Sequence, residues 1–159
     1  LLSEYGREYF WAVILIIMFL VGGIDGKVAG LVILFSFILI IPLNIIIKEL
    51  IDIDRPPFYE SNILERTPQG KTYPSGHASM VSAGALSVVL FFRKSRNQKI
   101  VASFVVIEAG LVCISRLYLG VHYPLDVLGG ILFGSGISLL VGSNHRIIKK
   151  LLIRLQFKK

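Results

Sequence analysis

A chain of 159 residues is long enough for one domain, but its composition is not that of a soluble domain. Hydrophobic residues make up 54% of the chain, mean hydropathy is +0.73, and 17% of residues are charged, against about 25% in soluble domains. So short a chain has too little interior to bury this apolar surface, and lipid is therefore its expected solvent. The net charge of +7 indicates a membrane surface and not nucleic acid, because the basic residues lie between and after apolar runs.

Five apolar runs follow one another along the chain, and we predict that each forms a membrane-spanning helix. A helix needs about 20 residues to cross the hydrocarbon core, with a lower limit near 17. The second run reaches this length alone, whereas the others need their flanking residues. The sequence thus predicts an all-α, polytopic transmembrane helical bundle of about five spans, in a single membrane-embedded domain over residues 1–159. The runs cover residues 9–24, 28–47, 78–92, 99–115 and 125–143.

The segments around these runs are polar or basic. The first run has Tyr9 and Trp11 as interfacial anchors and shows neither a Lys/Arg-rich leader nor a small-residue cleavage site. It is therefore expected to be a retained span and not a signal peptide. The tail mixes basic and apolar residues, which is typical of an amphipathic helix lying on a membrane surface. The segments are a polar turn at 25–27, a long polar segment at 48–75, a basic loop at 93–99, a loop at 116–124 and the tail at 145–159.

Five spans place successive connections on alternating sides of the membrane. One side holds the N-terminus and the loops 48–75 and 116–124, and the other holds 25–27, 93–99 and the tail. Cytoplasmic loops carry an excess of Lys and Arg, so the first side is expected to face outward from the cell membrane, with the tail in the cytoplasm. The basic residues are Arg7, Lys48, Arg55, Arg66, Lys71 and Arg116 on the first side, and Lys27, Arg93, Lys94, Arg96, Lys99, Arg146, Lys149, Lys150, Arg154, Lys158 and Lys159 on the second.

The outward side gathers residue types that suit phosphate chemistry. Ionisable groups at membrane depth are energetically unfavourable and by default indicate a functional site. Phosphoryl transfer depends mainly on positioning and charge neutralisation, which arginine forks, lysines and the free amides of a helix N-terminus can supply. Pro74 is suited to the first turn of such a helix. The residues are Lys48, Arg55-Pro56, Pro74-Ser75-Gly76-His77, Ser115-Arg116, His122 and Asp126.

The order and spacing of these residues resemble the three-part signature of the type 2 phosphatidic acid phosphatase superfamily. The first part is Lys48, six residues and Arg55-Pro56; the second is Pro74-Ser75-Gly76-His77. The third part is Ser115-Arg116, five residues, His122, three residues and Asp126. All three lie between apolar runs on the same predicted side, and the flanking spans fit the membrane branch of the family.

The resemblance implies a role for each residue. His122 attacks phosphorus to form a phosphohistidine, and His77 protonates the leaving oxygen and later activates water. Asp126, about one helical turn after His122, holds the other ring nitrogen and fixes the tautomer. Pro124 lies between them, so His122 is expected to precede a helix that has Asp126 in its first turn. The phosphate is expected to contact Lys48, Arg55, Ser75, Gly76 and Arg116.

The implied activity is hydrolysis of a phosphate or diphosphate on a membrane lipid. A polyprenyl diphosphate is the first choice, and phosphatidic acid or phosphatidylglycerophosphate comes next. One alternative is a transferase or haloperoxidase-like relative. Another is a transporter or channel whose charged residues line a pathway, which predicts charges spread through several spans. The substrate and the oligomeric state are left open.

No metal ion and no cofactor are expected at this site. His77, His122 and Asp126 could form a site of two histidines and one carboxylate, but the neighbouring cations suit an anion better. Cys113 is the single cysteine, which excludes a disulfide within the chain and argues against a cysteine metal site.

A few further residues have predictions of their own. Glu108, inside the fourth run, pairs with a charge, lines a pathway or lies near an interface, and the sequence does not choose among these. Gly130 and Gly134 have the small-xxx-small spacing of close helix contacts, which we assign to packing within one chain in preference to dimerisation. Asp52 and Asp54 are expected to be solvated loop charges that pair with nearby cations.

Overall fold

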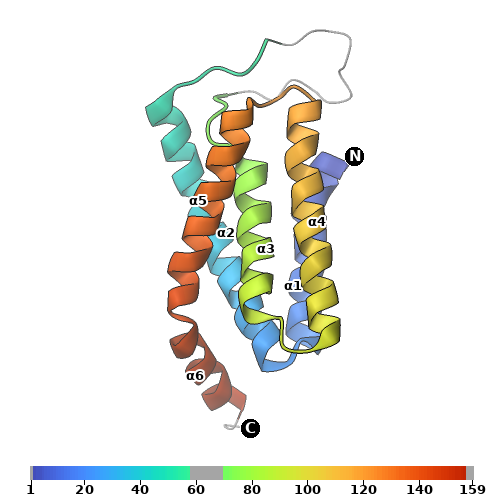
Figure 1. The fold of residues 1–159 in the computed structure, drawn as a ribbon. Helices are drawn as coiled ribbons and strands as arrows, with labels where there is room; N and C mark the ends of the chain where they lie inside the picture. Colours follow the sequence, from blue (N-terminus) through green and yellow to red (C-terminus); the bar gives the residue numbers. More distant parts are fainter. Residues whose placement is uncertain (1, 58–69, 157–159) are drawn as a thin grey trace.

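The computed structural model describes residues 2–57 and 70–156, and over these residues the chain is a bundle of helices with no strand (Figure 1). Each predicted apolar run is one helix, and the tail forms a sixth, which confirms the all-α membrane bundle. Three helices, α2, α4 and α5, are long and apolar enough to cross a membrane. The helices are α1 (Leu2–Val21), α2 (Gly23–Ile51), α3 (Gly76–Phe91), α4 (Arg96–Tyr118), α5 (Pro124–Ser143) and α6 (His145–Gln156).

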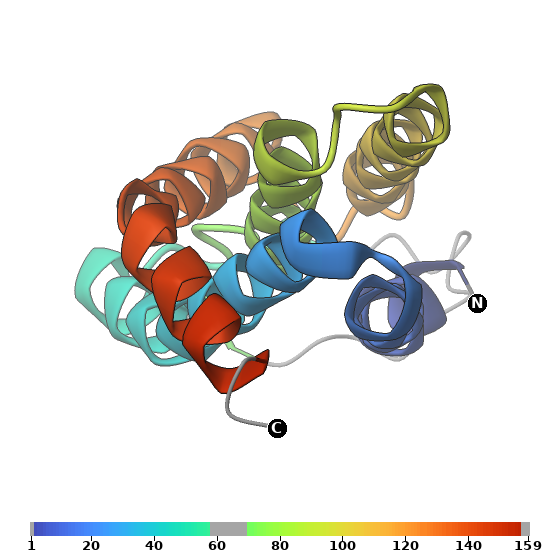
Figure 2. The same ribbon diagram turned by 90° about the horizontal axis from the view of Figure 1, so that it is seen from below.

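Two helices, α3 and the apolar part of α1 (Tyr9–Val21), are shorter than a usual span. The position of α3 explains its length, because it packs against α1, α2, α4 and α5 and lies among them in Figure 2. A helix covered mainly by protein does not have to match the hydrocarbon thickness. Small residues allow its neighbours to approach closely, and those buried on α3 include Ala78, Ser79, Ala83, Gly84 and Ala85.

The chain reverses between α1 and α2 at Gly22 and Gly23, so the predicted turn at 25–27 is wrong. Gly23 has φ of +61°, a left-handed conformation that favours glycine because it has no Cβ. Asp25 consequently lies in the first turn of α2, where a carboxylate interacts favourably with the helix dipole. Its Oδ2 also lies 2.5 Å from the Nζ of Lys94, which follows α3.

Close contact between α5 and α3 confirms that Gly130 and Gly134 pack within the chain. A Cβ added at Gly130 would lie 2.6 Å from the carbonyl oxygen of Ser75. A Cβ added at Gly134 would lie 2.6 Å from the hydroxyl of Ser82 and closer still to the carbonyl oxygen of Ser79. Real Cβ atoms essentially never approach another heavy atom this closely, so both positions require glycine.

Alanine at Gly134 is expected to lower the free energy of unfolding by about 1–3 kcal/mol, because its methyl group would meet the backbone of α3. Gly136 is a matched control in the same helix, since a Cβ there has nothing within 4 Å. Gly136→Ala is expected to be neutral or slightly stabilising, because alanine favours helix. Thermal unfolding of both variants in detergent micelles measures the difference. Equal midpoints would contradict the close α3–α5 contact.

One end of the bundle brings together the C-terminal ends of α2 and α4 and the N-terminal ends of α3 and α5 (Figure 1). All three parts of the sequence signature lie at this end. The helix α6 extends from the other end and contacts α2 and α5. It is amphipathic as predicted, with exposed Ile147, Leu151 and Leu155 spaced four residues apart. Its contact with a membrane surface remains a prediction.

Candidate active site

Hydrogen bonds join the first and second parts of the signature to the third. The backbone N–H of Ser75, just before α3, donates to the carbonyl oxygen of Asp126 in α5 at 2.9 Å. The guanidinium of Arg55 donates through Nη1 to the carbonyl oxygen of Val121, the neighbour of His122, at 3.0 Å. The structure therefore brings residues far apart in sequence into one site, as the motif spacing predicted.

Lys48, in the last turn of α2, holds the loop that precedes α3. Its Nζ donates to the carbonyl oxygens of Lys71 at 2.6 Å and of Thr72 at 3.2 Å. The side chain of Lys71 turns the other way and pairs with Asp52 at 2.6 Å and Asp54 at 2.8 Å. These hydrogen bonds raise the pKa of Lys71 and confirm the predicted pairing of both aspartates. The loop is thus fixed from two sides.

The helix of the second part begins at Gly76, so the placement of Pro74 in its first turn is wrong. Ser75 is the N-cap, and its hydroxyl oxygen accepts a hydrogen bond from the N–H of Ala78 at 3.5 Å. Serine is a preferred N-cap because its oxygen satisfies a free amide, and this preference determines where α3 begins. Ser75 is fully buried, whereas Gly76 and His77 are half-buried in the first turn of α3.

His122, Thr72 and Asp126 form a buried hydrogen-bonded chain. The Thr72 Oγ1 lies 2.9 Å from the Nδ1 of His122 and donates to the Oδ2 of Asp126 at 2.6 Å. The direct distance from Nδ1 to Oδ2 is longer, 3.5 Å. The same Oδ2 accepts from the N–H of Tyr123 at 2.7 Å in the capping box of α5. Pro124 begins α5 and Asp126 lies in its first turn, as predicted.

These contacts determine the tautomer of His122. A carboxylate can only accept hydrogen bonds, so the single hydroxyl hydrogen of Thr72 must point to Asp126. The Thr72 oxygen then has lone pairs for His122, and the Nδ1 of His122 must carry the hydrogen between them. In a neutral ring, Nε2 is therefore unprotonated and holds a lone pair. This is the protonation state that a nucleophilic histidine needs.

The surroundings of His122 favour the neutral ring. Burial, followed by the positive charges of Arg55, Lys48 and Arg116, lowers its pKa to about 3, and a hydrogen bond with the backbone of Thr72 has a smaller opposing effect. A histidine with this pKa is unprotonated throughout the neutral range. All three cations of the signature are therefore close enough to act on one ring.

Arg116 and Glu108 lie on the fourth span at different depths. Arg116 is in the last turn of α4 and is 3% exposed, so its charge is held inside the protein. Glu108 lies two turns earlier beside Phe10 and Phe104, in an apolar hollow of about 460 Å³. Neither of its carboxylate oxygens has a hydrogen-bond partner among the described residues. The hollow also reaches Ser115 of the signature, but neither histidine of the signature lines it.

Two buried residues of the site were absent from the sequence predictions. Thr72 is 0% exposed and contacts both His122 and Asp126. Asn44, on α2 one turn before Lys48, donates through its side chain to the carbonyl oxygen of Pro74 at 3.4 Å. Asn44 offered one signal, because it is an amide inside a run of apolar residues. In residues 2–57 and 70–156, no three side chains among His, Cys, Asp and Glu cluster as a metal site would require.

Comparison with known proteins matches this chain to a lipid phosphatase family. The model of the PAP2 superfamily matches residues 29–147. An undecaprenyl-diphosphatase of Sulfolobus acidocaldarius is 38% identical over 144 residues, which cover 87% of this chain and 65% of that protein. Phosphatidylglycerophosphatase B of Bacillus subtilis is 36% identical over 118 residues, covering 68% and 54% of the two chains. This chain therefore spans between about half and two thirds of these relatives' lengths.

A solved structure of a membrane phosphatase has a similar fold. The crystal structure of a transmembrane PAP2-type phosphatidylglycerolphosphate phosphatase from Bacillus subtilis superposes with a TM-score of 0.71 and 28% sequence identity. The match covers 92% of this chain and 74% of that one.

Proposed function

Since the chain belongs to the PAP2 superfamily, we propose that it is an enzyme that hydrolyses a phosphate or diphosphate ester of a membrane lipid. The observation that carries the proposal is the buried chain of Asp126, Thr72 and His122, which leaves the Nε2 of a neutral histidine free beside three cations. Such a nitrogen is a nucleophile, and such cations attract a phosphate.

The phosphate is held by charge and by backbone amides in this proposal. Lys48, Arg55 and Arg116 neutralise its oxygens, and Lys48 and Arg55 have further N–H groups beside those that bind loop carbonyls. The N-terminus of α3, with Gly76 in its first turn, adds free amides and the positive end of the helix dipole. The buried Ser75 supports this contact mainly by capping the helix.

The reaction then has two steps. The Nε2 of His122 attacks the terminal phosphorus, the bond from that phosphorus to its ester oxygen (in a diphosphate, the bridging oxygen) breaks, and His77 donates a proton to that oxygen, which leaves with the lipid. As the ring becomes positively charged, its Nδ1–H stays hydrogen-bonded to Thr72 and through it to the negative charge of Asp126, which stabilises the phosphohistidine. In the second step His77 accepts a proton from water, which attacks phosphorus and releases His122 and inorganic phosphate.

The lipid class follows from the relatives and from the position of the site. The undecaprenyl-diphosphatase that is 38% identical favours a polyprenyl diphosphate, with phosphatidic acid and phosphatidylglycerophosphate as the next choices. A site at the end of the bundle holds the phosphate of the substrate near the membrane surface. The tail of the substrate can then stay inside the membrane, beside the helices. The excess of basic residues at the opposite end supports a site that faces outward and a cytoplasmic tail.

A panel of phosphorylated lipids tests the proposed function directly. Purified protein in detergent is expected to release phosphate from at least one of a polyprenyl diphosphate, phosphatidic acid and phosphatidylglycerophosphate, and to release it fastest from the polyprenyl diphosphate. The rate is expected to be the same in excess chelator, because Lys48, Arg55 and Arg116 supply the positive charge. A protein that is folded but inactive on every lipid would overturn the proposal. Loss in chelator that a divalent ion restores would indicate a metal enzyme.

A further inference from the structure

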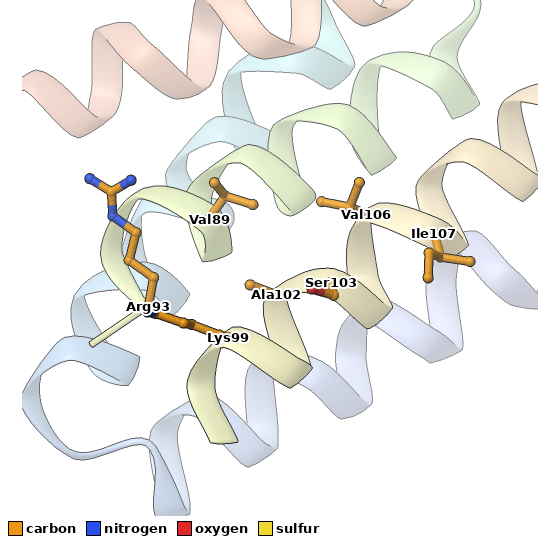
Figure 3. A pocket seen from close by; sticks show the side chains of 7 residues that line it. All are labelled: Val89, Arg93, Lys99, Ala102, Ser103, Val106 and Ile107. Atoms are coloured by element: carbon orange, nitrogen blue, oxygen red, sulfur yellow. The ribbon is translucent and has the colours of Figure 1, made fainter. Parts of the chain in front are cut away.

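A groove of about 500 Å³ lies between α3 and α4 near the end of the bundle opposite His122. Figure 3 shows Val89 of α3 across the groove from Val106 of α4, with Arg93 and Lys99 close to the connection between the two helices. The groove has apolar walls and a basic end. We call it the α3–α4 groove, and its walls include Val89, Ala102, Val106 and Ile107.

The apolar walls continue toward the middle of the bundle. A second hollow of about 360 Å³ shares Val89 and Val106 with the first and reaches Cys113 and Ile131. From Lys99 to Cys113, α4 rises about 21 Å at about 1.5 Å per residue. Half of a hydrocarbon core is about 15 Å thick. The two hollows together therefore run along roughly one leaflet of a membrane.

Two cations, Arg93 and Lys99, lie at the basic end of the groove. Arg93 and Lys99 are exposed, and within the described part of the chain neither forms an ion pair. Lys94, which lies between them in sequence, is different because it pairs with Asp25 at 2.5 Å. Two cations at headgroup level above an apolar groove attract an anionic group that has an apolar chain attached.

We propose that the α3–α4 groove binds one anionic phospholipid from the leaflet opposite the candidate active site. Its phosphodiester contacts Arg93 and Lys99, and one acyl chain lies between Val89 and Val106. In a bilayer some lipid chain has to fill the groove, and a chain that fills it brings its headgroup to the two cations. The charge of that headgroup then selects anionic over zwitterionic lipid. The proposal does not rest on the proposed hydrolysis, because no residue of the groove belongs to the candidate active site.

Native mass spectrometry of delipidated protein in detergent tests this site, with dioleoylphosphatidylglycerol and dioleoylphosphatidylcholine as probes. Phosphatidylglycerol is anionic but is a phosphodiester, so hydrolysis of a phosphomonoester does not consume it. We expect one phosphatidylglycerol to bind more tightly than phosphatidylcholine. Each basic side chain at an anionic surface contributes roughly fivefold to binding, so Arg93→Gln with Lys99→Gln should weaken it about 30-fold.

Two variants and one competition experiment distinguish lipid binding in the groove from attraction by general surface charge and from binding of free phosphate. Arg96→Gln with Lys150→Gln makes the same charge change at the same end of the bundle, outside the groove, and should leave binding within about threefold. Ser103→Trp fills the groove and keeps both cations, so it should abolish phosphatidylglycerol binding. Inorganic phosphate in about 100-fold molar excess over the lipid should not displace it.

Four outcomes would overturn the proposal. Equal losses in the two charge variants would show that surface charge alone attracts the lipid. Normal binding in folded Ser103→Trp would place the lipid elsewhere, and displacement by inorganic phosphate would show that the cations bind phosphate without a chain. A dimer that Ser103→Trp dissociates would assign the groove to a second copy of this chain.

Discussion

Alanine in place of His122 is expected to lower kcat for lipid dephosphorylation by about 10⁴-fold or more while the protein stays folded and membrane-bound. The variant keeps the three cations and the α3 N-terminus, so phosphate can still bind, but it has no nitrogen to attack phosphorus. Water would have to attack directly, without the covalent intermediate that divides the reaction into two easier steps. The initial rate of phosphate release from the best lipid of the panel, compared with wild type, measures this loss.

A control and a trapping experiment make the result specific to His122. His145, at the start of α6 and at the other end of the bundle, provides a matched histidine, and His145→Ala should retain wild-type activity. Wild-type protein quenched in alkali with a radiolabelled substrate should carry label on histidine, which His122→Ala should lack. Substantial activity in His122→Ala, or label that persists in it, would remove the proposed mechanism.

The sequence predicted the helices well because lipid imposes a simple rule. A spanning segment must be apolar over a minimum length and must satisfy its backbone hydrogen bonds internally, and both demands appear in the local sequence. The error at 25–27 arose because charged residues were interpreted as a break, whereas Gly23 makes the reversal and Asp25 stabilises the first turn of α2. The depth of α3 in the bundle depends on its neighbours, so a length rule alone could not predict that a 16-residue helix fits.

The motif spacing predicted which signature parts meet, but it did not predict how they are held together. Lys48 and Arg55 were predicted to bind phosphate, and the structure shows a contact that was not predicted, because each donates to the carbonyl of a loop. Such contacts depend on where a loop runs in three dimensions. Thr72 was not predicted for the same reason. A threonine in a loop looks the same in sequence whether its side chain is solvated or is buried between a histidine and a carboxylate, as it is here.

Valine in place of Thr72 is expected to lower kcat by about 10²-fold with little change in KM. Valine keeps the shape of threonine but removes the hydroxyl that accepts from His122 Nδ1 and donates to Asp126 Oδ2. The ring then loses the contact that keeps its hydrogen on Nδ1, and proton positioning of this kind contributes about 10²–10⁴-fold to catalysis. Phosphate binding should persist, because Lys48 binds the backbone carbonyl of residue 72 and not its side chain.

Serine and a double variant distinguish this positioning role from a structural one. Thr72→Ser restores the hydroxyl and should recover most of kcat, whereas a role in packing alone would leave it impaired. Thr72 and Asp126 act on His122 through one chain of hydrogen bonds, so Thr72→Val with Asp126→Asn should lose little more than the worse single variant. Additive losses would mean that Asp126 acts on His122 independently, across the 3.5 Å that separates Oδ2 from Nδ1. Wild-type kcat in Thr72→Val would show that this direct contact is sufficient and that the hydroxyl between them is dispensable.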